Sequence, residues 1–316
     1  STPKPSSAAS DVYKRQKLTP LEPTSGGVEE ISALLLPDLR QHFSRRAARL
    51  RQLAEGHEQA DYLRFAARVA EAQQAIFERS PVAAEELQAL VARIGDGAPL
   101  DVQRLPRSAY WQAALEQLIE HLRRDASAPL TKALDAIGGM PAEQREACAE
   151  QLLLGHYLQV DSGQALFFWA ALSLYFSQLA SALPVTAQAQ VGEQRQHCPV
   201  CCSAPVASVI LSGKRAGLRY LHCGLCESRW HMVRAKCSNC EGTGQLHYWS
   251  LEHQDSAVKA ESCGDCQSYL KVFYYPHDQR LEPVADDLAS LALDAGLEAE
   301  GFARSSISPF LFPGQA

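Results

Sequence analysis

The sequence predicts a multidomain α+β protein: an all-α domain, then two tandem modules with four cysteines each, then a C-terminal helix. Apolar residues recur at spacings of three and four through most of the first 190 residues. Nine of the ten cysteines fall between Cys198 and Cys266, and eight of them form C-x-x-C pairs. With 316 residues, the chain also exceeds the size that a single core usually serves.

We therefore expect five parts along the chain. They are a disordered or non-native tail over residues 1–25, an all-α domain over 26–190, the two modules over 191–236 and 237–282, and a C-terminal helix and tail over 283–316. Residues 11–16, DVYKRQ, read like a translated sequencing adapter, which is why residues 1–16 are doubtful as native sequence.

Composition narrows the class of protein. Apolar residues make up 46% and charged residues 21%, as in an ordinary soluble globular protein, so disorder cannot be the main state. The net charge of −6 does not favour a protein that holds nucleic acid. The most apolar stretch, residues 166–183, contains Ser173, Ser177 and Gln178, so it predicts a buried helix rather than a membrane span. Without a signal-like start, we expect a cytoplasmic protein.

Periodicity and breakers predict the helices in order. Residues 29–55 contain no glycine and precede Gly56, which is a plausible stop. Next comes a stripe of Tyr62, Phe65, Val69, Ala72 and Ile76, and Ser80-Pro81 then resembles a helix start with Ser80 as its cap. Further helices are expected at 108–124, 142–154 and 163–183, because Gly138–Pro141 and Pro184 supply breaks.

From about residue 197 to 280 the pattern changes to short strands. β-Branched and aromatic residues lie between glycine-containing turns, in the segments 206–211, 218–221, 230–233, 245–251 and 269–275. After these, one helix is expected over 284–299, where Leu288, Leu291, Ala292 and Ala295 form an apolar stripe.

The cysteine region is an internal repeat. The second half copies the first with an offset of 39 to 40 residues, and CGLCESRW at 223–230 parallels CGDCQSYL at 263–270. Two C-x-x-C turns facing each other close a tetrahedral shell of four thiolates, which fits zinc or a single iron. The repeat therefore predicts one metal on Cys198, Cys201, Cys223 and Cys226, and a second on Cys237, Cys240, Cys263 and Cys266.

Two other arrangements of these cysteines compete with this one. A pairing swapped across the repeats would lose their symmetry, and disulfides are disfavoured because cytosolic thiols stay reduced. Both shells have four cysteines available, so neither needs an open position of the kind that hydrolytic metal centres keep. Cys202, Cys148 and the histidines His197, His222 and His231 are interpreted as groups outside both shells.

With these motifs in hand, the chain resembles the formate dehydrogenase accessory proteins of bacteria. The resemblance rests on the four C-x-x-C pairs, ADYLRFAARVAEAQQ at 60–74, CSNCEGTGQLHYWSLE at 237–252, AESCGDCQSYLKVFY at 260–274 and DDLASLALD at 286–294. It covers nearly the whole chain after about residue 17. The sequence departs from the family pattern at Cys202, where the family usually has a glycine.

The resemblance implies a function as well as a fold. It implies rubredoxin-like or zinc-ribbon modules with two metal ions per chain, iron favoured over zinc, at the eight paired cysteines. It also implies a cytoplasmic maturation factor rather than an enzyme, with the catalytic subunit of formate dehydrogenase as its partner. The sequence leaves the oligomeric state open, including a homodimer.

Two alternatives of other classes remain at this stage. A double zinc ribbon could bind nucleic acid, although residues 197–280 carry nine basic and seven acidic residues, a weak excess for that role. A rubredoxin-like electron carrier would use an iron shell that cycles between oxidation states. The Arg-rich segment 45–51 is interpreted as a solvated helix face, with an acidic partner as the alternative.

Overall fold

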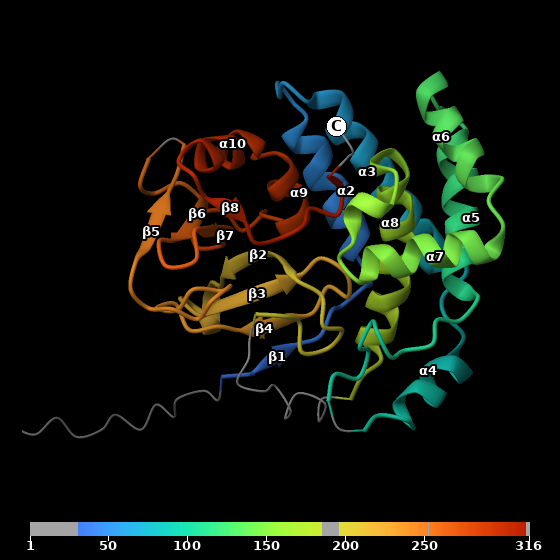
Figure 1. Ribbon diagram of the computed structural model, residues 1–316, viewed down its shortest axis with the longest axis horizontal. Helices are drawn as coiled ribbons and strands as arrows, with labels where there is room; N and C mark the ends of the chain where they lie inside the picture. Colours follow the sequence, from blue (N-terminus) through green and yellow to red (C-terminus); the bar gives the residue numbers. More distant parts are fainter. Residues whose placement is uncertain (1–30, 96, 185–195, 252, 314–316) are drawn as a thin grey trace, which may run out of the picture. The chain divides into compact units, whose positions relative to one another are not determined.

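The computed structural model describes residues 31–95, 97–184, 196–251 and 253–313, and those from Ser32 onward belong to one compact unit. Within this unit, helices of the first half lie beside a sheet that carries the two cysteine modules, and the last two helices cover the sheet (Figure 1). The predicted α+β class is confirmed. The expected tail over residues 1–25 lies outside the described residues.

The helical part is built around α8. Its helices are α2 His42–Leu53, α3 Ala60–Arg79, α4 Ala84–Val91, α5 Tyr110–Arg123, α6 Ala128–Gly138, α7 Ala142–Leu153 and α8 Ser162–Ser181, with a short 3₁₀ turn η2 at Tyr157–Gln159. Every side chain of α8 from Ala165 to Ala180 is buried. A helix that is apolar all round is stable only when it is surrounded, which explains the long apolar stretch of the sequence. In the part of the chain that is described, no helix could cross a bilayer.

The prediction of one helix over residues 29–55 is wrong for the described residues before His42. Leu34–Leu35 is a strand, β1, and Ala33 O accepts a hydrogen bond from His231 N at 2.9 Å. Pro37 follows two residues later and disfavours helical backbone at Leu36, so the helix begins only after this break. Ser80 is also not a helix start, since it ends α3, and α4 begins four residues later.

Eight strands in the described residues form one sheet. The remaining strands are β2 Pro205–Ile210, β3 Arg219–Cys223, β4 Arg229–His231, β5 Leu246–Trp249, β6 Val258–Cys263, β7 Ser268–Tyr274 and β8 Ala303–Arg304. Their order is β1-β4-β3-β2-β7-β6-β5, with β8 also beside β7. Each module contributes one antiparallel three-stranded meander, β2-β3-β4 or β5-β6-β7.

A parallel pair joins the two modules. Strand β2, the first of its module, runs beside β7, the last of its module, with Val209 opposite Phe273. The repeats are thus successive copies along one sheet. The buried residues of the first module, including Val206, Leu221 and Trp230, belong to the same core as α3 and α8. A separate small core of Ala260, Tyr269, Leu293 and Leu297 lies in the second module and the C-terminal region.

The predicted single helix over 284–299 is divided into two. Helix α9 spans Pro283–Leu288 and α10 spans Leu291–Ala299. Between them the Ser290 hydroxyl donates to the carbonyl oxygens of Asp286 (2.7 Å) and Asp287 (3.3 Å). A serine side chain that satisfies the last carbonyls of a helix competes with continuation of that helix, which explains the break.

Candidate metal centres

All four C-x-x-C segments fold into the same turn. In three of them the amide of the first cysteine donates to the carbonyl five residues later: Cys198 to Ser203, Cys223 to Ser228 and Cys237 to Gly242, at 2.8 to 2.9 Å. The fourth has the same partners across a strand pair, Cys263 opposite Ser268. The turn places both sulfurs on one side, where backbone amides such as Leu225 N and Asn239 N lie 3.3 to 3.4 Å from a sulfur.

The structure groups the eight cysteines as two sets of four, which we name site 1 and site 2. Site 1 consists of Cys198, Cys201, Cys223 and Cys226, and site 2 of Cys237, Cys240, Cys263 and Cys266. Within each set the sulfurs all lie within 4.8 Å of one another. Each site combines the two C-x-x-C turns of one module, which we call knuckles, and the swapped pairing across the modules is absent from the described residues.

The spacing of the sulfurs fits a tetrahedral metal. In site 1 the closest pairs, Cys198–Cys226 and Cys201–Cys223, are 3.5 Å apart, and in site 2 the pairs Cys237–Cys266 and Cys240–Cys263 are 3.8 and 3.7 Å apart. Four thiolates about 2.3 Å from a shared metal are about 3.8 Å from one another. Each site can therefore hold one zinc or iron ion, and its four ligands leave no coordination position open.

The thiols of site 1 differ in their electrostatics. Burial, with hydrogen bonds to neighbouring thiols, raises the pKa of Cys198 and Cys223 well above the usual value for cysteine, whereas hydrogen bonds from the other three cysteines outweigh burial and lower the pKa of Cys201 well below it. Four thiolates cannot coexist there without a compensating charge, which a divalent metal supplies. In site 2, burial raises the pKa of Cys266, but hydrogen bonds to Ser268 and Asn239 outweigh it and lower that pKa to about 7.

A backbone feature repeats in every knuckle. The non-glycine residues with positive φ in the described chain are Cys202, Glu227, Glu241 and Gln267, with φ between 53° and 66°. Each directly follows the second cysteine of a pair. The left-handed conformation at this position is the reason that a glycine is favoured there, and Cys202 departs from the family pattern at such a position. All four turns nevertheless have a non-glycine residue at this position.

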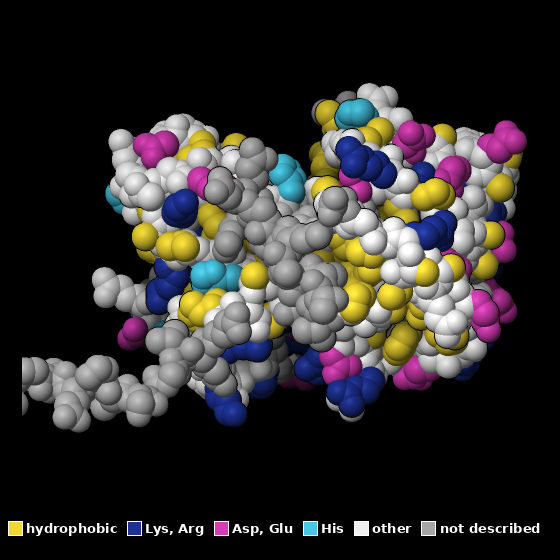
Figure 2. All heavy atoms as spheres, turned by 90° about the horizontal axis from the view of Figure 1, so that it is seen from below, with side chains coloured by type: hydrophobic (Ala, Val, Ile, Leu, Met, Phe, Trp, Pro, Cys, Tyr) yellow, Lys and Arg dark blue, Asp and Glu magenta, His cyan; other side chains and the backbone are white. Residues whose placement is uncertain are grey.

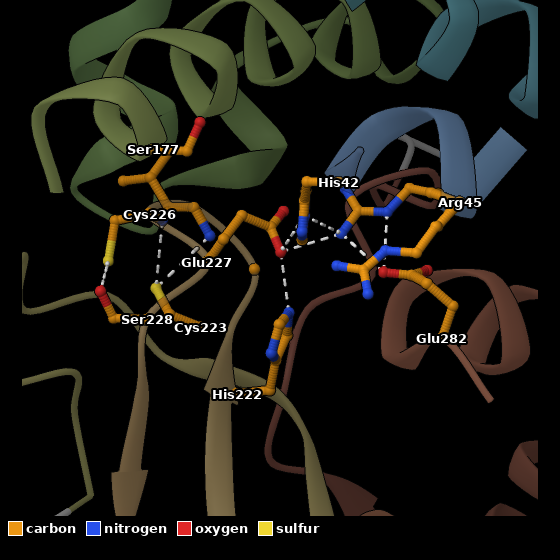
Figure 3. A network of polar contacts seen from close by, with 12 residues as sticks. His42, Arg45, Ser177, His222, Cys223, Cys226, Glu227, Ser228 and Glu282 are labelled. Atoms are coloured by element: carbon orange, nitrogen blue, oxygen red, sulfur yellow. Dashed lines mark hydrogen bonds and ion pairs between the residues drawn. The ribbon is translucent and has the colours of Figure 1, made fainter. Parts of the chain in front are cut away.

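A buried cluster of charged residues borders site 1 (Figure 3). Glu227, which follows Cys226, lies with its Oε2 2.8 Å from Arg46 Nη2, 2.8 Å from His222 Nε2 and 3.0 Å from His42 Nε2. Arg46 also donates to Glu282 Oε1 at 2.9 Å, and Glu282 caps α9 by accepting from Ala285 N. The cluster thus ties α2 and the start of α9 to the second knuckle of site 1.

Opposed effects set the pKa values in this cluster. Burial raises the pKa of Glu227 and Glu282, but the charge of Arg46 and the other charges and hydrogen bonds of the cluster together outweigh it, so both lie below the usual range. Burial lowers the pKa of His222 to about 4, which makes its ring neutral near pH 7. Because Arg229 Nε donates to His222 Nδ1 at 3.0 Å, the ring proton lies on Nε2 and is donated to Glu227.

The remaining sequence candidates lie outside both sites. Cys202 is exposed as a residue, but its thiol is partly shielded from solvent, and this shielding together with the nearby Asp101 and Cys201 raises its pKa to about 11, so it is a thiol at neutral pH. Cys148 is half-buried against the core. His197 is exposed, whereas His222 is fully buried and supports Glu227. From the sequence, His222 could be interpreted only as either a surface group or a group that supports a metal ligand.

The Arg-rich segment is not simply a solvated helix face. Arg46 is buried in the cluster at site 1, and Arg49 forms an ion pair with Asp286 at 2.6 Å. Farther along α2, Arg51 pairs with Glu71 at the surface, at 2.6 Å. The carboxylate partners of Arg46 and Arg49 lie more than 180 residues away in the sequence, so no local pattern could reveal them. The segment therefore links α2 to the first module and to α9 through ion pairs in the protein interior.

Models of one known protein family match this chain. Three family models match: "FdhE, N-terminal" over residues 31–193, "FdhE, central domain" over 197–234 and "FdhE, C-terminal domain" over 235–311. The FdhE homolog of Edwardsiella ictaluri is 52% identical over 292 residues, 92% of this chain and 95% of the relative. The protein FdhE of Salmonella typhimurium is 50% identical over 290 residues, 90% of this chain and 93% of the relative.

A solved structure matches as well. The crystal structure of the FdhE protein from Pseudomonas aeruginosa superimposes with a TM-score of 0.80 at 38% sequence identity. The match covers 90% of this chain and 100% of that one. The fold described above is therefore shared with a protein determined by crystallography.

Proposed function

Since the chain belongs to the FdhE family, we propose that it is a non-catalytic accessory factor in the maturation of formate dehydrogenase. In this proposal it acts in the cytoplasm and binds the catalytic subunit of that enzyme before export. The link to formate dehydrogenase comes from the family resemblance. The non-catalytic role is supported by the pair of closed four-cysteine sites. A metal bound by four cysteines has no open coordination position for water or a substrate.

We assign the eight paired cysteines as ligands of two metal ions. Cys198, Cys201, Cys223 and Cys226 hold the first, and Cys237, Cys240, Cys263 and Cys266 hold the second. Zinc and iron both fit the distances between the sulfurs, and the family resemblance favours iron over zinc. When bound, the metal cross-links the two knuckles of a module. The hairpin of about twenty residues between the knuckles is then held rigid for recognition of a partner.

The nucleic-acid alternative loses support in the structure. Arg219 and Lys271, two of the nine basic residues of the module region, are 1% exposed and are paired with Glu261 and Asp287. On the face shown in Figure 2, the Lys and Arg side chains are scattered among Asp and Glu side chains. A polyanion needs a concentrated basic surface, and this face does not provide one.

The electron-carrier alternative keeps one specific observation in its favour. Electron exchange with a partner requires a metal near the surface, and site 2 includes the exposed Cys240. Site 1 does not meet this requirement, because each of its four cysteines is at most 1% exposed. Comparison of iron-loaded with zinc-loaded protein distinguishes the two roles, since zinc has no second oxidation state.

The test is rescue of formate dehydrogenase activity in cells that lack their own accessory factor. We expect the intact chain to restore the activity and to co-purify with the catalytic subunit, and the Cys263→Ser/Cys266→Ser variant to lose rescue. Cys148→Ser is the matched control, because it removes a thiol outside both sites and should rescue fully. If the metal-loaded protein neither binds the subunit nor restores activity, the proposed function is wrong, whichever metal it carries.

A further inference from the structure

The two metal sites differ in how well they are sealed from solvent. At site 1, all four cysteines are buried, with exposed fractions of 0 to 1%. At site 2, Cys237 and Cys263 are buried, but Cys240 is exposed and Cys266 is half-buried. Sequence alone could not show this, because the two modules have the same cysteine pattern. The difference comes from what surrounds each module.

Site 1 is sealed by segments from outside its own module. The first knuckle is fixed by the loop before α5, where Leu100 N donates to Val200 O at 2.8 Å and Val102 N to Cys201 O at 3.3 Å. The second knuckle is fixed by α8, whose Trp169 Nε1 donates to Gly224 O at 3.0 Å.

The C-terminal segment completes this cover. Pro309 lies so close to the second knuckle that a Cβ on Gly224 would be 3.4 Å from its side chain. The Phe312 ring packs against the Trp169 ring with a tilted geometry and 5.5 Å between the ring centroids, and Trp169 itself is only 2% exposed. Access to the sulfurs of site 1 therefore requires movement of the helical part or of the C-terminal segment.

Site 2 is surrounded mainly by its own module. Asn239 Nδ2 and Ser268 Oγ lie 3.7 and 3.1 Å from Cys266 Sγ. Gly264 N donates to Gln245 O at 2.8 Å, and a Cβ on Gly242 would lie 2.7 Å from Asp265 Oδ2. From outside the module, Ala303 N of β8 donates to Gln267 O at 2.8 Å, which fixes the knuckle but leaves Cys240 exposed.

We infer that site 2 is an exchangeable metal site that loads and releases a zinc or ferrous ion in the folded protein, whereas site 1 keeps its metal. A competing ligand must reach a metal–sulfur bond before it can remove the metal, and the exposed Cys240 gives it that access. At site 1 the competitor must wait for a local opening that breaks the contacts with α8 and the loop before α5. Exchange at site 1 is therefore limited by that opening.

The test is release of metal from the full chain loaded with two zinc ions, using the coloured chelator 4-(2-pyridylazo)resorcinol. We expect two phases of equal amplitude, with the second at least about 100-fold slower because it needs a local opening. N-Ethylmaleimide added in parallel should label Cys240 and Cys266 first, as mapped by mass spectrometry. The assay contains no formate dehydrogenase, so its outcome is independent of the proposed function.

Variants assign the phases. Cys240→Ser should abolish the fast phase and leave the slow one. Trp169→Phe removes the hydrogen bond to Gly224 and should speed up the slow phase at least threefold. Trp111→Phe is the matched control: Trp111 is as buried as Trp169, and the substitution removes its indole hydrogen bond to Glu146 at 3.0 Å, far from both sites in the sequence, so both phases should be unchanged. Release of both metals in a single phase, or early labelling of Cys198 or Cys201, would overturn the inference.

Discussion

Replacement of Cys223 and Cys226 by serine is expected to unfold most of the protein, whereas Cys263→Ser/Cys266→Ser should cost one metal and leave the helices folded. The reason is the distribution of the core. The first module shares its buried residues with α3 and α8, while part of the second module has a small core of its own. Structural zinc contributes about 10–16 kcal/mol in small domains. This equals or exceeds the stability of a typical domain, about 5–15 kcal/mol.

Far-ultraviolet circular dichroism during heating measures this difference. The site 1 variant should lose helical signal already at room temperature or melt far below the parent protein. The site 2 variant should keep a cooperative helical transition close to that of the parent. The account of a shared core would be contradicted if the two variants melted alike, or if the site 1 variant kept its full helical signal and its melting temperature.

Arg46→Met is expected to destabilise the protein by about 3–5 kcal/mol, because it leaves Glu227 and Glu282 buried without their cation. Arg51→Met is the matched control in the same helix. Its partner is Glu71, and both side chains are at least 40% exposed, so the loss should be at most about 1 kcal/mol. The two substitutions remove the same group from positions that differ in burial.

Denaturant unfolding followed by tryptophan fluorescence compares the two variants. The difference in free energy of unfolding between Arg46→Met and Arg51→Met should be at least about 2 kcal/mol. Equal values would mean that the cluster beside site 1 contributes nothing that a surface ion pair does not. The Arg46→Met protein should still bind two metals when folded, since the hydrogen bonds of Arg46 go to Glu282, His42 and Glu227 and not to the cysteines.

Local patterns predicted much of the fold. The apolar stripe from Tyr62 to Ile76 lies within α3, and the long apolar stretch of residues 166–183 forms most of the buried helix α8. The cysteine repeat indicated two modules, and its spacing indicated which cysteines come together. These features depend on residues close in sequence or on an exact repeat, so they can be recognised without tertiary information.

Other features depend on distant residues and could not be predicted. The parallel pair of β2 and β7 joins strands about sixty residues apart, and β1 pairs with a strand nearly two hundred residues later. The same holds for Arg46, whose partners Glu227 and Glu282 lie in the module and at α9. The difference in solvent exposure between the two sites follows from such contacts. Trp169 of α8 covers one knuckle of site 1, and nothing in the cysteine repeat predicts that a helix lies there.

The metal content of the full chain, purified without oxygen, tests the central claim most directly. Elemental analysis should give two zinc or iron ions per chain, and one per chain in the Cys263→Ser/Cys266→Ser variant. A ferric–thiolate absorption in the visible range would identify iron after exposure to air, and a colourless protein with two metals would identify zinc. A folded parent protein that holds no metal, or whose eight cysteines are joined in disulfides, would contradict the account.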